Sequence, residues 1–359
     1  MPWDKEKTAV LLEKMQRLVP GEIRLMEVCG THTMSIAAAG IKSMLPKEVK
    51  LLSGPGCPVC VTPPQVIDAV LELSMEKDVI ITSYGDMLRV PGSKAGDSLL
   101  RRKALGAQVI TVYSPVDAVE LALQHPEKQV VFLGVGFETT APGTAAAVLT
   151  AQEKGAKNFS LWSMLKLVEP ALRALIAMDG FHVDGFLCPG HVATIIGADG
   201  FAFLPKDYKL PAVIAGFEPE DILLAVFRLV KQLAEKSPRL ENEYTRAVSQ
   251  SGNLLAQKIM KNCFEARFDV WRGLGGIEAS GLGLRGELKE YDAERRFAVR
   301  YATAEPPTAC RCGEVITGRL SPERCPMFGR ACTPEDPVGP CMVSSEGACA
   351  AAWKYAEIL

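Results

Sequence analysis

Two cysteines stand on a short, stiff loop in the first part of this 359-residue chain. Cys57 and Cys60 belong to the segment Gly-Pro-Gly-Cys-Pro-Val-Cys at 54–60, and two residues separate them. This spacing is typical of a redox dithiol or of a metal-binding pair. The glycines let the backbone turn sharply, while the prolines keep it rigid. We therefore expect a chemical role for the pair, and two buried structural thiols are the plainer alternative.

A third cysteine is expected to join this pair. Cys29 follows the preceding predicted strand and starts a predicted helix, where the helix dipole favours a thiolate. The carboxyl ends of parallel strands share one edge of a sheet, and ligands bind there in open α/β folds. We expect Cys29, Cys57 and Cys60 to converge at this edge. Because thiolates are soft ligands for iron, zinc or Cu(I), the three sulfurs form a candidate metal site.

Six more cysteines lie near the end of the chain: Cys310, Cys312, Cys325, Cys332, Cys341 and Cys349. The surrounding segment, 305–345, is rich in Pro, Gly and Cys and too poor in apolar residues for a core of its own, so a metal centre would hold it together. No Cys-x2-Cys pair of the zinc-ribbon kind occurs among them, and no histidine lies nearby. Iron–sulfur clusters accept four thiolates from irregular loops. The spacing favours such a cluster over zinc, with two cysteines left as a redox pair.

Two other titratable residues follow predicted strands. His32 is a metal ligand, an acid/base group or a solvent-facing helix-start residue, and the sequence does not choose among these. Glu138 is either a carboxylate favoured by the N-terminus of the next helix, with Thr139 or Thr140 as cap, or an acid/base or cluster-facing residue. The isolated Cys188 and Cys263 are expected to be buried small hydrophobes.

Short apolar strands alternate with helices along most of the chain, which predicts parallel sheets covered on both faces. The sequence Gly-Phe-Glu follows two of the predicted strands, at 136–138 and 216–218, and this hints at two similar units. We predict an α/β protein with two doubly wound parallel-sheet domains of similar topology and a C-terminal cysteine-rich iron–sulfur domain. The expected ranges are an N-terminal helix at 1–20, α/β domains at 21–128 and 129–240, and the iron–sulfur domain at 241–359.

The pattern changes after about residue 240. Residues 244–262 are expected to be helical. The segment Gly-Leu-Gly-Gly at 273–276 lacks the preceding strand and following helix that a dinucleotide-binding fingerprint requires, so we assign it no nucleotide.

Composition excludes several classes of protein. The net charge of −2 argues against non-specific nucleic-acid binding. No apolar run approaches the roughly 18 to 20 residues of a membrane span, and the charged N-terminal segment is not expected to be a signal peptide. We expect a cytoplasmic protein, whose eleven cysteines are mostly reduced, metal-bound or redox-active.

Five motifs stand out along the chain: Cys-Gly-Thr-His at 29–32, the 54–60 segment, Gly-Phe-Glu-Thr-Thr at 136–140, Pro-Gly-His-Val at 189–192 and Gly-Pro-Cys-Met-Val-Ser-Ser-Glu-Gly-Ala-Cys at 339–349. Together they resemble the HypD family of [NiFe]-hydrogenase maturation factors, and the resemblance runs from about residue 20 to the end of the chain.

This resemblance implies a scaffold on which the Fe(CN)2CO group of the hydrogenase is built, together with a small HypC-type chaperone. Cyanide would arrive from HypE, made ultimately from carbamoyl phosphate by HypF. Cys29 would help to hold the nascent iron, with Cys57 and Cys60 as the adjacent thiol pair or as further ligands.

The family's [4Fe-4S] pattern implies four cluster ligands here: Cys310, Cys325, Cys332 and Cys349. It leaves Cys312 and Cys341 as an extra pair, similar to the arrangement in ferredoxin:thioredoxin reductase, although Cys310 and Cys312 compete for one ligand position. We expect electrons to enter the cluster, pass to this pair and reach Cys57 and Cys60 by dithiol exchange.

Two alternatives belong to other classes of protein. One is a thiol–disulfide oxidoreductase with no role in iron assembly. The other is a zinc-stabilised binding module with inert cysteines.

Overall fold

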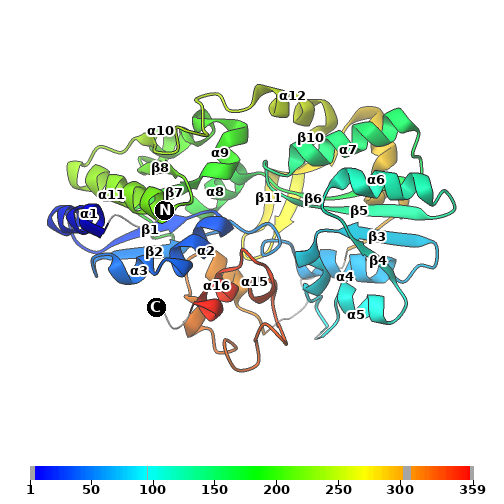
Figure 1. The fold of residues 1–359 in the computed structure, drawn as a ribbon, viewed down its shortest axis with the longest axis horizontal. Helices are drawn as coiled ribbons and strands as arrows, with labels where there is room; N and C mark the ends of the chain where they lie inside the picture. Colours follow the sequence, from blue (N-terminus) through cyan, green and yellow to red (C-terminus); the bar gives the residue numbers. More distant parts are fainter. Residues whose placement is uncertain (1–4, 95, 302–308, 356–359) are drawn as a thin grey trace.

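The computed structural model describes residues 5–94, 96–301 and 309–355. It is an α/β structure with two parallel sheets that lie side by side, each flanked by helices (Figure 1). The first sheet has five strands in the order β2 (Val49–Ser53), β1 (Ile23–Glu27), β7 (Gly185–Pro189), β8 (Ala212–Ala215) and β9 (Leu240–Asn242). The second has four in the order β4 (Gln108–Thr111), β3 (Val79–Ser83), β5 (Gln129–Gly136) and β6 (Phe159–Leu165).

The central strands are continuous apolar runs, as parallel strands covered on both faces require. All five residues of β3 and all seven of β6 are buried. The strands predicted between residues 22 and 215 occur at the expected positions, with ends that differ by a few residues. The prediction of an α/β fold with parallel sheets is therefore confirmed.

The sheets group the strands differently from the predicted ranges. Strand β1 pairs with β7, with Leu25 opposite Gly185, so the first sheet combines strands from 23–53 with strands from 185–242. The second sheet is formed by the intervening 79–165. A boundary at 128/129 would separate β3 from its partner β5. Alternation of strands and helices predicts the strands but carries no information on their order, so this boundary does not coincide with the sheets.

The helices over the sheets begin and end with recognisable signals. Helix α6 has Pro115 in its first turn and a capping box between Ser114 and Asp117. Helix α11 buries a stripe of residues spaced three or four apart. The helices are α1 (Lys5–Leu18), α2 (Gly30–Ala38), α3 (Ile41–Met44), α4 (Pro64–Leu73), α5 (Leu99–Ala104), α6 (Pro115–Gln124), α7 (Ala141–Lys154), α8 (Val168–Ile176), α9 (Gly190–Ile196), α10 (Phe203–Tyr208), α11 (Pro219–Glu235), α12 (Leu254–Cys263), α13 (Ala293–Arg296), α14 (Cys312–Ile316), α15 (Pro340–Val343) and α16 (Ala348–Lys354).

The region after residue 243 departs from the prediction in two ways. The helix expected at 244–262 is shorter in the structure, where only α12 (Leu254–Cys263) is helical and residues 244–253 form turns and loops. An antiparallel hairpin follows, with β10 (Phe264–Trp271) and β11 (Gly275–Leu284). The glycines of 273–276 lie at its turn and at the start of β11. Strand β10, which the sequence did not indicate, precedes these glycines, and a second strand follows them.

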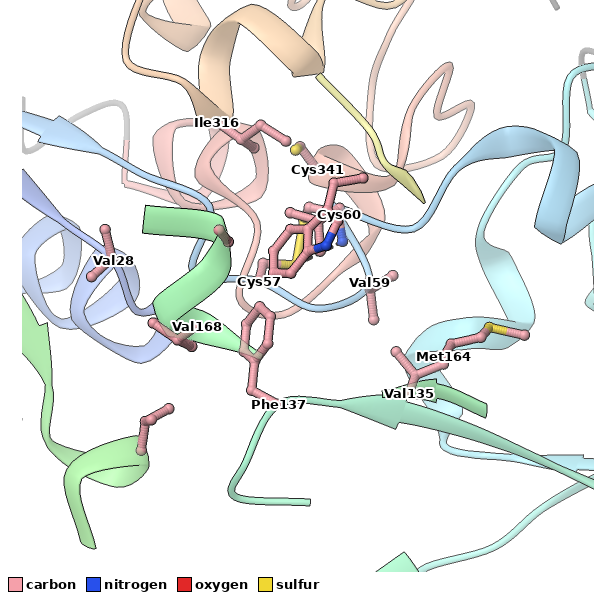
Figure 2. Close-up of a cluster of buried hydrophobic side chains, with 14 of the residues drawn as sticks. Val28, Cys57, Val59, Cys60, Val135, Phe137, Met164, Val168, Ile316 and Cys341 are labelled. Atoms are coloured by element: carbon pink, nitrogen blue, oxygen red, sulfur yellow. Dashed lines mark hydrogen bonds between the residues drawn. A yellow bond between two sulfur atoms is a disulfide. The ribbon is translucent and has the colours of Figure 1, made fainter. Parts of the chain in front are cut away.

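The cysteine-rich C-terminal segment packs beneath α2 and between the two sheets (Figure 1). Its few apolar residues, such as Ile316 and Met342, belong to a buried cluster that also contains Val28, Val59 and Trp271. Figure 2 shows part of this cluster, including Ile316, Cys341 and both cysteines of the 54–60 loop. The segment thus shares a core with the α/β part of the molecule. None of the helices in the described part of the chain is long and apolar enough to cross a membrane.

Candidate thiol and metal site

Close backbone packing joins Cys29 to the 54–60 loop. The amide of Gly30 donates to the carbonyl of Gly56 at 3.1 Å. A Cβ atom on Gly56 would lie 2.3 Å from the backbone nitrogen of Cys29, so only glycine permits this approach. Because β1 and β2 are paired neighbours, their carboxyl ends carry Cys29 and Cys57 to the same edge of the sheet, as the sequence suggested.

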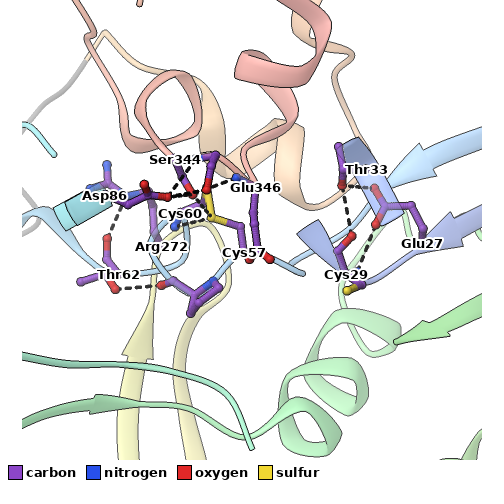
Figure 3. Close-up of a disulfide and its surroundings, with 12 residues drawn as sticks. Glu27, Cys29, Thr33, Cys57, Cys60, Thr62, Asp86, Arg272, Ser344 and Glu346 are labelled. Carbon is purple, nitrogen blue, oxygen red and sulfur yellow. Dashed lines mark hydrogen bonds between the residues drawn. A yellow bond between two sulfur atoms is a disulfide. The ribbon is translucent and has the colours of Figure 1, made fainter. Parts of the chain in front are cut away.

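Cys57 and Cys60 form a disulfide, with their Cα atoms 5.2 Å apart (Figure 3). The backbone amide of Cys60 donates to the Cys57 sulfur at 3.1 Å. Both residues are buried, Cys57 with 4% and Cys60 with 0% of its surface exposed. The pair is thus held as an oxidised dithiol, and its environment excludes water.

Cys29 is the N-cap residue of α2, and its side chain makes no capping hydrogen bond. Its backbone amide donates to Glu27 Oε2 at 3.0 Å, and the Thr33 hydroxyl donates to Glu27 Oε1 at 2.5 Å (Figure 3). Burial raises the pKa of the Cys29 thiol to about 12 and that of the Glu27 carboxyl to about 7. Desolvation of the buried Cys29 thiol thus opposes the thiolate that the helix dipole favours.

A short segment from the C-terminal region covers these cysteines. The Ser344 hydroxyl oxygen lies 3.4 Å from the Cys57 sulfur. Both the amide and the hydroxyl of Ser345 donate to Asp86 Oδ2, at 2.9 and 2.8 Å. The Thr31 hydroxyl donates to Glu346 Oε1 at 2.9 Å. Residues 344–346, here called the strap, thus connect the end of β3 in the second sheet to α2 beside the first (Figure 3).

His32 does not face solvent, so that one of the three alternatives is wrong. It is fully buried, its Nε2 lies 2.8 Å from the carbonyl oxygen of Gly216, and its ring stacks on Phe217. Burial lowers its pKa to about 4. Its Nδ1 has no hydrogen-bond partner among the described residues. The ring is therefore neutral near pH 7 and attached to the β8–α11 junction.

Glu138 is also buried, with 3% of its surface exposed. Its Oε1 accepts a hydrogen bond from the backbone amide of Val168 at 2.9 Å. The carboxylate thus caps α8, and not the helix α7 that follows it in sequence. Its Oε2 lacks a partner among the described residues, and burial raises its pKa to about 7. Cys188 and Cys263 are fully buried among apolar residues, as predicted.

The six C-terminal cysteines all line one small cavity of about 20 Å³, together with Met327, Phe328 and Met342. The Cys312 thiol is hydrogen-bonded to the thiols of Cys341 and Cys310. Burial is the main reason that the pKa of Cys349 is raised, and the neighbouring Cys310, Cys312, Cys325 and Cys332 raise it further.

A set of thiols around one largely apolar cavity has the donor chemistry of an iron–sulfur centre. The side chains are not arranged as a finished site, since no group of three or more His, Cys, Asp or Glu residues in the described ranges has metal-binding geometry. The residues therefore fit such a centre by their chemistry and their common location.

The whole chain matches a known family. Residues 6–356 match the family model "HypD: Hydrogenase formation hypA family". The chain belongs to the HypD family of hydrogenase maturation factors. It is 46% identical over 340 residues to "Hydrogenase maturation factor HypD" of Azotobacter vinelandii, covering 93% of this chain and 89% of that protein. The protein of the same name from Escherichia coli (strain K12) is 44% identical over 336 residues, with 93% and 90% covered.

In this HypD-family chain, the sequence reading missed polar residues that contact the cysteines from elsewhere. Asp86 and Ser344 meet above the disulfide, and Arg272 reaches the chain just after it, where its Nε donates to the carbonyl of Thr62 at 3.0 Å. The sequence could have pointed to Asp86, because this residue follows the carboxyl end of strand β3, just as Cys29 and Cys57 follow the carboxyl ends of β1 and β2. No local pattern marked Arg272, since the hairpin that carries it was not predicted.

Proposed function

We propose that this HypD-family chain is the scaffold on which the Fe(CN)2CO group of [NiFe] hydrogenase is assembled, with the iron as its cargo. Cys29 is the principal iron ligand, and Cys57 and Cys60 act as the adjacent dithiol or as further ligands. A HypC-type chaperone shares the iron, and HypE donates cyanide. The observation that carries this proposal is the packing of Cys29 against the loop that holds the Cys57–Cys60 disulfide.

Iron binding at Cys29 requires that its thiol lose a proton, because the thiolate is the ligand. The Glu27 carboxyl lies beside the Cys29 backbone, and the pKa of Glu27 is near neutrality. Glu27 therefore fixes the position of Cys29 by accepting a hydrogen bond from its backbone amide. The Cys29 sulfur makes no capping hydrogen bond to α2. The strap has to move aside, since Cys29 is only 7% exposed.

The C-terminal cysteines supply the reducing equivalents in this proposal. A [4Fe-4S] cluster held by Cys310, Cys325, Cys332 and Cys349 would provide one-electron chemistry. Cys312 and Cys341, whose thiols are hydrogen-bonded, form the extra pair. Exchange converts this dithiol and the Cys57–Cys60 disulfide into a Cys312–Cys341 disulfide and a Cys57/Cys60 dithiol. Two electrons and two protons move, and one S–S bond replaces another.

Reconstitution with a cyanide donor tests the role of the Cys57/Cys60 pair. We expect Cys57→Ala and Cys60→Ala to prevent loading of cyanide onto iron, because neither variant can cycle between dithiol and disulfide. Cys263→Ala is a matched control, since it removes a buried thiol far from the pair. Cyanide loading at the wild-type level in both variants would contradict the proposal.

The disulfide also favours a second candidate, a thiol–disulfide oxidoreductase that acts on protein disulfides in general. The two functions differ in their partners. An assembly scaffold forms a stable complex with a HypC-type chaperone and leaves a generic disulfide substrate intact, whereas an oxidoreductase reduces that substrate. An anaerobic absorption and EPR spectrum separates both from a zinc-stabilised binding module, which would give no visible absorption band and no paramagnetic state.

A further inference from the structure

The glycine-rich turn of the β10–β11 hairpin has no part in the function proposed so far. We call Trp271 to Gly275 the hairpin tip. On one side it is hydrogen-bonded to Val61 and Thr62, the residues that directly follow the Cys57–Cys60 loop. The Arg272 amide donates to the carbonyl of Val61 at 2.8 Å, and its Nε donates to the carbonyl of Thr62 at 3.0 Å. The tip therefore holds the two residues that directly follow Cys60.

On its other side the hairpin tip touches the backbone of the C-terminal segment. A Cβ atom on Gly273 would lie 2.6 Å from the Cα of Gly313 and 2.8 Å from its carbonyl oxygen. Gly273 also has a positive φ of 81°, which glycine adopts without strain. Gly313 directly follows Cys312 in α14. The hairpin tip thus lies between the two proposed thiol pairs and contacts the chain next to each.

Arg272 has an unusual environment for a purely structural residue. It is only 5% exposed, and its Nη2 is buried without a hydrogen-bond partner among the described residues. A buried N–H group without a partner is unfavourable, and such groups are rare in folded proteins. The Arg272 guanidinium lies beside the chain that directly follows Cys60, where Nε is hydrogen-bonded to the Thr62 carbonyl.

We propose that the hairpin tip sets the spacing between the Cys57–Cys60 and Cys312/Cys341 pairs, and that Arg272 is a positioning residue for exchange between them. This inference rests on the exchange step proposed above. A thiolate of one pair attacks the disulfide of the other, and negative charge develops on the departing sulfur. The Arg272 guanidinium stabilises that charge from a fixed position, because its Nε is hydrogen-bonded to the Thr62 carbonyl and the Arg272 backbone amide is hydrogen-bonded to the Val61 carbonyl.

Two glycines of the hairpin tip provide a matched pair of variants. Gly273→Ala adds a methyl group that collides with Gly313, whereas Gly275→Ala has the same kind of positive φ, 76°, but nothing within 4 Å of the added atom. Both variants carry similar backbone strain, so any difference between them reports the contact with α14. Misplacement by about 1 Å is enough to slow such a reaction by on the order of tenfold or more.

The assay follows reduction of the disulfide in the intact chain. Anaerobic protein with its native metal content is treated with dithionite and quenched with acid at intervals. Differential alkylation and mass spectrometry then give the reduced fraction of Cys57 and Cys60. Cys312→Ser supplies the background rate that bypasses exchange. We expect Gly273→Ala to be slower than Gly275→Ala by about tenfold, and equal rates would overturn the inference.

Arg272 is tested in the same assay. Arg272→Gln removes the charge and should slow exchange, while Arg272→Lys restores the charge and should recover much of the rate. Arg296→Gln is the control for a structural arginine, since Arg296 is hydrogen-bonded to the carbonyls of Phe159 and Glu290, and it should exchange normally. A wild-type rate in Arg272→Gln, or equal slowing in Gln and Lys, would overturn the role of the charge.

The same assay separates a failure of the proposed exchange step from a failure of the role of the hairpin tip. If the wild-type protein reduces Cys57–Cys60 no faster than Cys312→Ser, the exchange step of the proposed function is wrong. If the wild type is faster than that background but the variants of the hairpin tip match their controls, only the present inference is wrong.

Discussion

Glu27, His32 and Glu138 are buried titratable side chains, and their ionisation should be visible in the stability of the protein. Glu27 and Glu138 have pKa values raised to about 7 by burial, while the pKa of His32 is lowered to about 4. A raised carboxyl pKa means that the folded state holds its proton more tightly than the unfolded state. The stability contributed by each glutamate is complete below about pH 4.5 and decreases as the pH rises through 7.

Glu138 offers the clearest test, because its Oε2 has no partner among the described residues. Glu138→Gln keeps the acceptor for the Val168 amide and cannot ionise. We expect the free energy of unfolding to be little changed at pH 4.5 and to exceed that of the wild type at pH 8 by about 1 to 3 kcal/mol. Urea titrations at the two pH values measure this difference. A gain of the same size at both pH values would show that ionisation is not its cause.

His32 should have the opposite dependence on pH. Its folded-state pKa lies below the unfolded value, so its contribution is complete above about pH 6.5 and decreases as the pH falls towards 4. We expect His32→Gln to reduce the acid-induced loss of stability by up to about 3 kcal/mol between pH 7 and pH 4. Urea titrations across this range measure the slope, with the surface residue His125→Gln as the control. A slope identical to that of the wild type would contradict the assignment.

The strap is the element that connects the two sheets above the disulfide. Asp86→Ala removes the acceptor for both hydrogen bonds from Ser345, which lie at an exposed position, and such bonds contribute about 0.5 to 1.5 kcal/mol each. We expect the reduced Cys57 thiol to be alkylated faster in this variant, because the strap opens more often.

The control for the strap is Asp117→Ala, which removes the capping-box acceptor of α6. It should destabilise the protein without changing the alkylation rate of Cys57. The rates are measured by mass spectrometry on protein reduced under mild conditions. Equal alkylation rates in the wild type and Asp86→Ala would show that the strap does not control access to the site.

Most of the strands and helices that position the site could be predicted from the sequence. Cys29 and the 54–60 loop follow two consecutive predicted strands, and because consecutive strands usually lie next to each other, their convergence could be expected. The hairpin was missed because β10 alternates charged and apolar residues and β11 is rich in glycine, so neither is a typical strand. Burial raises the pKa of the Cys29 thiol, and strap residue Glu346 reaches the neighbouring Thr31 from more than three hundred residues away, a contact that no local pattern reveals.

At the scale of the whole molecule, the interleaved sheets make the protein dependent on distant parts of its chain. Strands β1 and β2 need β7, and strands β3 and β4 need β5. We therefore expect a fragment containing residues 1–128 to lack a cooperative unfolding transition, because both of its sheet portions have an unpaired, apolar edge. Circular dichroism during urea titration provides the measurement. A cooperative transition in this fragment would contradict the strand order.

The same interleaving explains how the functional parts come together. The first sheet provides Cys29 and the Cys57–Cys60 loop, the second provides Asp86, and the hairpin and the C-terminal segment close over them. The order of the strands could not be read from the sequence, because the pairing of β1 with β7 joins residues that are far apart in the chain and contain no local signal for each other. Individual strands can therefore be predicted from the sequence, whereas their grouping into sheets cannot.

The central claim is that Cys29 holds the iron on which cyanide and carbon monoxide are assembled. Infrared spectroscopy of the complex purified with a HypC-type chaperone tests it most directly, using Cys29→Ala and the buried-thiol control Cys188→Ala. We predict that the iron-bound CN and CO bands are lost in Cys29→Ala and retained in Cys188→Ala. Bands of wild-type intensity in Cys29→Ala would contradict the account.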